Sequence, residues 1–79
     1  NGTSGNPSTT IRFSLPQREL VVLKIYNALG SEIATLVNGA MDAGEHRVTF
    51  DATGLPSGVY FYQIKTSSFS QTRKAVLMR

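Results

Sequence analysis

The side chains that could transfer protons or attack a substrate are few in this chain. Its 79 residues include one histidine, His46, five acidic residues and no cysteine. A serine nucleophile needs a base within reach and a third group that orients this base. His46 alternates with Val48 and Phe50, as residues on one face of a strand do, so we interpret it as a partly buried or rim residue and not as a general base. The Gly-x-Ser-x-Gly pattern of serine hydrolases does not occur.

The acidic residues do not form a pattern typical of a catalytic pair or a metal centre. We expect most of them in turns or on the solvent-facing sides of strands: Glu19, Glu32, Asp42, Glu45 and Asp51. A calcium site made by Asp42 and Glu45, or by Asp51 with turn carbonyls, is an alternative. Isolated acids in turns usually cap backbone amides instead. Since no Gly-rich phosphate loop opens a helix either, we predict no catalytic residue, no metal site, no cofactor and no enzymatic activity.

The secondary structure that carries His46 and the acidic residues is predicted to consist of strands. Alternating apolar residues and turn signals predict strands over 9–15, 20–26, 32–37, 46–51, 59–64 and 71–78. The segment 32–37 also has helical spacing, but its short length and the Asn38-Gly39 turn signal after it favour a strand, bulged or regular. The spacing predicts an all-β fold, an immunoglobulin-like or fibronectin-III-like antiparallel β-sandwich of about seven short strands, without the Cys and Trp set of antibody domains.

A turn rich in glycine and proline separates the strand that ends near Asp51 from the one that begins near Val59. Gly54 and Gly58 can adopt backbone angles that other residues resist, and Pro56 fixes its own. The strand after the turn is apolar on both faces, so we expect it in the centre of a sheet. Tyr60 is either a plain core aromatic or a residue whose hydroxyl binds nearby backbone, as the corner tyrosine of a sandwich does.

Charge is unevenly distributed along the chain. The formal net charge is +3, and residues 65–79 contain Lys65, Arg73, Lys74 and Arg79 without an acid. These cations either bind an acidic partner or protect an edge strand from aggregation, and on charge alone we favour protection. They do not alternate with exposed aromatic residues, so we expect no nucleic-acid partner.

The domain organisation follows from composition. Residues 1–8 are rich in Gly, Ser, Asn and Pro, and we interpret them as a linker before a sandwich domain at 9–79. No apolar run approaches the roughly 20 residues of a membrane span, and no secretory signal is recognisable at the start. We therefore expect this chain to be one domain of a longer protein.

Five short motifs, in order and with matching gaps, carry a resemblance to a known family. They are NPSTTIRF at 6–13, LKIYNALG at 23–30, AGEH at 43–46, LPSGVY at 55–60 and KAVL at 74–77. Together they resemble the type A C-terminal sorting domains of the type IX, or Por, secretion system. One departure is Ser8, where many members carry an aromatic residue, and it blurs where the domain begins.

The resemblance implies an immunoglobulin-like domain that acts as an address for an upstream cargo domain. The cargo would cross the periplasm, the outer-membrane translocon would recognise the domain, and a sortase-like peptidase would remove it near residues 1–5 or just upstream. The cargo would then be secreted or attached to the outer cell surface. The family's sorting residues correspond here to Gly58, Tyr60, Lys74 and Arg79.

Two other classes of function remain as alternatives. The immunoglobulin-like domain of the flagellar hook-capping protein shares the Lys-Ile-Tyr and Gly-Val-Tyr pattern, but there a Trp-Asp and a longer insert usually precede the second motif. Here Phe50-Asp51 leads directly into a short turn, which favours the sorting function. A carbohydrate-binding accessory module would need a row of exposed aromatic side chains, for which only Tyr26 and Phe61 are candidates.

Overall fold

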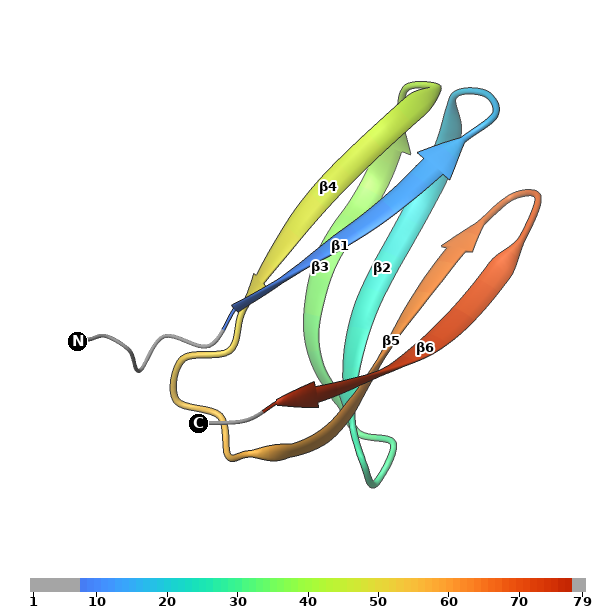
Figure 1. Ribbon diagram of the computed structural model, residues 1–79. Helices are drawn as coiled ribbons and strands as arrows, with labels where there is room; N and C mark the ends of the chain where they lie inside the picture. Colours follow the sequence, from blue (N-terminus) through green and yellow to red (C-terminus); the bar gives the residue numbers. More distant parts are fainter. Residues whose placement is uncertain (1–7, 78–79) are drawn as a thin grey trace.

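Strands and turns make up the whole of the computed structural model within residues 8–77, the part of the chain that the structure describes (Figure 1). The strands are β1 (Ser8–Leu15), β2 (Glu19–Asn27), β3 (Glu32–Met41), β4 (Gly44–Asp51), β5 (Gly58–Thr66) and β6 (Ser70–Leu77). They form two antiparallel sheets, one with the order β1-β4 and one with the order β3-β2-β5-β6. This architecture confirms the all-β fold class. The expected linker at 1–8 falls on residues 1–7, outside the described residues, and on Ser8, which begins β1.

The core lies between the two sheets and follows from the alternation of apolar residues. In β2, Val21, Leu23 and Ile25 face inward and are almost fully buried, whereas Leu20 faces solvent. The small sheet contributes Ile11 and other buried residues to the same core. The complete buried cluster is Ile11, Leu15, Val21, Leu23, Ile25, Phe50, Ala52 and Ile64. Because residues two apart in a strand point to the same side, one apolar face of each strand is enough to build this core.

The end of β3 differs from the sequence-based expectation. The Asn38-Gly39 pair does not form a turn, because β3 continues to Met41 and pairs with β2 along its whole length. Asn38 lies opposite Val22 and Gly39 opposite Val21, with register shifts further along this ladder. Pairing with a long central neighbour therefore overrides the local turn preference. The chain instead turns just before Gly44, whose φ is +116°.

The prediction that the strand after the Gly-Pro turn is central is confirmed. β5 lies between β2 and β6, with Leu23 opposite Ile64 on one side and Ile64 opposite Gln71 on the other. A tight bend joins β5 to β6. There the Thr66 amide donates to the Phe69 carbonyl at 2.8 Å, and the Thr66 hydroxyl accepts from the Ser68 amide at 3.1 Å.

The two sheets are unequal in width, and this leaves one side of the sandwich open. The small sheet contains only β1 and β4, whereas the large sheet contains four strands. Within residues 8–77, β1 pairs only with β4, and β6 pairs only with β5. Each of these two strands therefore has one edge without a backbone partner among the described residues.

Candidate functional site

The turn between β4 and β5 is held by its own hydrogen bonds. Asp51 Oδ1 accepts from the Thr53 amide at 2.9 Å and from the Thr53 hydroxyl at 2.6 Å. The Leu55 amide donates to the Ala52 carbonyl at 3.0 Å, and Gly54 has a φ of +88°, a conformation that glycine adopts without strain. The hydrogen bonds from Thr53 lower the pKa of Asp51. The capping role expected for acids in turns is thus confirmed at Asp51.

Tyr60 ties the start of β5 to this turn. Its side chain is only 8% exposed, and its hydroxyl donates to the Pro56 carbonyl, four residues upstream, at 2.7 Å. Of the two interpretations of Tyr60, the structure supports the corner tyrosine, since the ring is buried and the hydroxyl binds backbone. Tyr60 is therefore a residue that stabilises the fold.

The structure brings three of the four predicted sorting residues to one end of the β5–β6 ribbon. Gly58 lies opposite Leu77, Tyr60 opposite Ala75, and Lys74 is next to Ala75 on β6. The side chains of Tyr60 and Lys74 do not converge, because Tyr60 faces the core whereas Lys74 is exposed on the outer face of the sheet. The remaining predicted residue, Arg79, lies outside the described residues.

An apolar patch on the outer face of the large sheet surrounds Lys74. Val59 and Val76 lie opposite each other and are 37% and 61% exposed. Phe61 lies opposite Lys74 on β6 and opposite Tyr26 on β2. Both aromatic side chains are half-buried. The sequence did not reveal this patch, because the continuous apolar run at the end of β6 does not show which side faces the core.

Glu19 is a buried acid, and the prediction of an exposed position for it is wrong. It was expected in a turn or on a solvent face, but it is 4% exposed and begins β2. Its Oε1 accepts from the Ser67 hydroxyl at 3.0 Å and from the Ser68 hydroxyl at 2.7 Å. The signal was present, since Glu19 is two residues before Val21 and so shares its inward side. The contact joins the start of β2 to the bend between β5 and β6.

The burial of Glu19 predicts how stability depends on pH. Hydrogen bonds, chiefly from Ser68, hold the pKa of Glu19 below its ordinary value of 4.5. A carboxylate with a lower pKa in the folded state stabilises the fold above its ordinary pKa, and this contribution is lost as pH falls through the folded value. We expect the melting temperature to drop between pH 6 and pH 3, and to drop a few degrees less in Glu19→Gln. Circular dichroism measures this. The exposed Glu45→Gln variant is the control, and a wild-type pH profile in Glu19→Gln would contradict the prediction.

The contacts of His46 are those of a residue that packs within the fold. It is half-buried, its ring stacks on Phe13 with 5.5 Å between the centroids, and its Nε2 donates to the Asp42 carbonyl at 2.7 Å. The Asp42 carboxylate pairs with Arg18. The prediction of a partly buried histidine is confirmed. Among residues 8–77, no three His, Cys, Asp or Glu side chains gather in a way that could hold a metal ion.

These features define a class of protein: a small antiparallel β-sandwich domain with a corner tyrosine and a cation-bearing edge strand. Its described residues contain no helix long and apolar enough to cross a membrane. A family model described as a secretion system C-terminal sorting domain matches residues 6–78. The chain belongs to this family, the sorting domains of type IX secretion, and the resemblance seen in the sequence is confirmed.

Membership in the family places the protein among those exported from the cell, either to the surface or into the medium. It also implies an interaction with the type IX secretion machinery. The family is not known as catalytic. No curated protein and no solved structure matches the chain.

Proposed function

We propose that this domain is a non-catalytic address that directs a cargo domain preceding it to the type IX translocon. The cargo crosses the periplasm, and a sortase-like peptidase then separates it from the domain for release or surface attachment. The observation that carries the proposal is the family match, which extends over residues 6–78 and so includes all six strands.

The contacts of the sorting residues divide their roles. Gly58 begins β5, and Tyr60 is buried and bonded to Pro56, so both serve the fold first. Lys74 is exposed on β6 and has no ion-pair partner among the described residues, so it is free to contact the translocon. We assign recognition to Lys74 and, further along the same segment, to Arg79.

Point variants test this assignment better than removal of the last strand. Ala75 and Leu77 lie opposite Tyr60 and Gly58, and Leu77 packs against the core. Deleting residues 74–79 would remove these contacts together with the cations, so lost export would not distinguish recognition from folding.

The experiment fuses the chain to a fluorescent carrier with a secretory leader in a bacterium that has a type IX system. We expect the carrier outside wild-type cells and not outside cells that lack the translocon. Lys74→Glu is expected to reduce the exported carrier about tenfold, the effect of losing roughly 1.4 kcal/mol of binding. The matched control is Lys65→Glu, the same charge reversal at an exposed position. Lys65 lies near the end of β5, whereas Lys74 lies opposite Phe61 near its start.

Two results would count against different parts of the proposal. Export that does not depend on the translocon refutes the sorting function itself. Equal export of the Lys74→Glu and Lys65→Glu fusions, with both domains folded by circular dichroism, refutes the role of Lys74 alone.

A further inference from the structure

We propose that the open side of the sandwich binds an extended segment of a partner protein in which apolar and acidic residues alternate. The segment adds to the free edge of β1 as a third strand of the small sheet. This inference goes beyond the sorting function, because it concerns the groove between the sheets and is tested by binding to the isolated chain.

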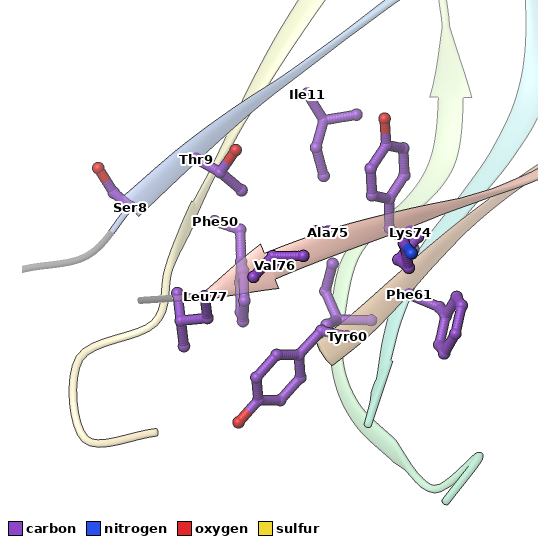
Figure 2. A pocket seen from close by; sticks show the side chains of 12 residues that line it. Ser8, Thr9, Ile11, Phe50, Tyr60, Phe61, Lys74, Ala75, Val76 and Leu77 are labelled. Carbon is purple, nitrogen blue, oxygen red and sulfur yellow. The ribbon is translucent and has the colours of Figure 1, made fainter. Parts of the chain in front are cut away.

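The groove lies between β1 on one side and the β5–β6 ribbon on the other (Figure 2). Its volume is about 490 Å³. Thr9 and Ile11 line it from β1, Phe50 from β4, and Tyr62, Ala75 and Leu77 from the large sheet. Figure 2 shows Thr9 and Ile11 on one side of this space and Ala75 and Leu77 of β6 on the other, with Phe50 between them.

The edge of β1 that borders the groove has the chemistry of a strand-binding site. Within residues 8–77 β1 pairs only with β4, so a row of its amide and carbonyl groups has no backbone partner. Such an edge is a template for an added strand, whose main-chain hydrogen bonds supply affinity while alternate side chains enter pockets. Every second side chain of the added strand would lie on Ile11, Phe50 and Leu77, which requires apolar residues at these positions.

The charges near the groove predict which residues lie on the other side of the added strand, the side that faces away from the core. β1 and β6, the two strands whose free edges border the groove, carry no acid, and their cations are Arg12, Arg73 and, on the outer face of the large sheet, Lys74. None of these three cations has an ion-pair partner among the described residues. On β4, Arg47 lies opposite Arg12. Asp51, opposite Ser8, accepts hydrogen bonds from its own turn, and Glu45, opposite Ser14, is not among the residues that line the groove. Acidic residues in the partner segment would complement this charge.

The same charges argue against a second copy of this chain as the occupant. An edge-to-edge pair of two β1 strands, or of β1 with β6, would bring cations of the two copies together, which is a device that discourages such pairing. Of the two free edges, we assign that of β1 to the partner segment, because a strand added to it lies over Ala75 and Leu77 of the large sheet. In β1, Arg12 is the only charged residue, and short hydroxyl side chains occupy several other positions.

The test is a titration of the isotope-labelled chain, followed by NMR, with a blocked peptide of about eight residues, the length of β1, that alternates valine and glutamate. We expect shifts and slowed amide exchange in β1, and binding that weakens as salt is raised. A peptide that alternates valine and lysine is expected to bind at least about tenfold more weakly. Equal binding of the two peptides, or shifts that avoid β1, overturns the proposal.

Matched variants separate the groove from the rest of the surface. Ala75→Trp fills the groove and is expected to weaken the acidic peptide at least about tenfold. Ala40→Trp adds the same ring at an exposed position of β3 and is expected to leave binding unchanged. Equal binding by the two variants overturns the proposal. The proposal is also overturned if sedimentation shows a dimer in the absence of peptide and dimer formation shifts the β1 signals, because a second copy would then occupy the groove. Export of the carrier fusion is scored separately, so failure here leaves the sorting function standing.

Discussion

Replacing Leu23 with alanine is expected to destabilise the domain by about 2–5 kcal/mol, the usual cost of deleting a buried leucine side chain. Leu23 is 0% exposed at the centre of β2, between β3 and β5. A domain of this size has a thin core and a free energy of unfolding of only about 5–10 kcal/mol. The variant is therefore expected to lose much of its stability, which urea denaturation followed by circular dichroism measures.

The control for Leu23→Ala lies on the same strand. Leu20 is 69% exposed on the opposite face of β2, so Leu20→Ala is expected to change stability by no more than about 0.5 kcal/mol. Equal losses in the two variants would mean that the faces of β2 are assigned wrongly. The export assay adds a second comparison, since only the Leu20→Ala domain should sort like the wild type.

Substitutions at Tyr60 are expected to separate its ring from its hydroxyl. Tyr60→Ala should cost about 3–5 kcal/mol, because it empties a site that is 8% exposed in the native fold. Tyr60→Phe should cost about 1 kcal/mol, because it removes only the hydrogen bond to the Pro56 carbonyl. Thermal unfolding measures both differences.

A matched control and an export readout complete the Tyr60 experiment. Tyr26→Phe removes a hydroxyl from a half-buried ring on the outer face and is expected to leave stability unchanged. If Tyr60→Phe is as stable as the wild type, the corner contact does not stabilise the fold. If a folded Tyr60→Phe domain loses export, the hydroxyl has a role in recognition that burial does not explain.

The sequence was sufficient to predict the strands whose two faces differ clearly. The alternation of residues in 20–26 predicted β2, and the apolar residues on both faces of 59–64 predicted that β5 is a central strand. The same rule applied to Glu19 would have placed it in the core, but acids were assigned to the surface by type. Periodicity thus carried more information than residue class.

Features that depend on pairing could not be predicted in this way. The Asn38-Gly39 signal was overridden because β2 offered a partner along the whole of β3, and nothing in the local sequence reveals that partner. The division of the strands into sheets of two and four, which creates the open side, is likewise a property of the assembled chain.

The predicted sorting residues show the same limit. The motifs located Gly58, Tyr60 and Lys74 in the chain, but only the register of β5 with β6 shows that Tyr60 and Lys74 face opposite sides of one ribbon. A motif gives the positions of residues along the chain, whereas the exposure of each side chain depends on the face of the sheet to which it points.

The order of strands in the large sheet has a consequence for the rate of folding. The pairs β2–β3 and β5–β6 are neighbours in sequence and can zip from their turns within microseconds. They are joined by the β2–β5 ladder, in which Val21 meets Thr66 from the far end of the chain. The entropy of closing so large a loop is lost before the long-range contacts form. Two-state folding of such a topology therefore takes milliseconds to seconds. Because an isolated hairpin is at best marginally stable, the domain gains a stable core only when the β2–β5 ladder joins the two hairpins.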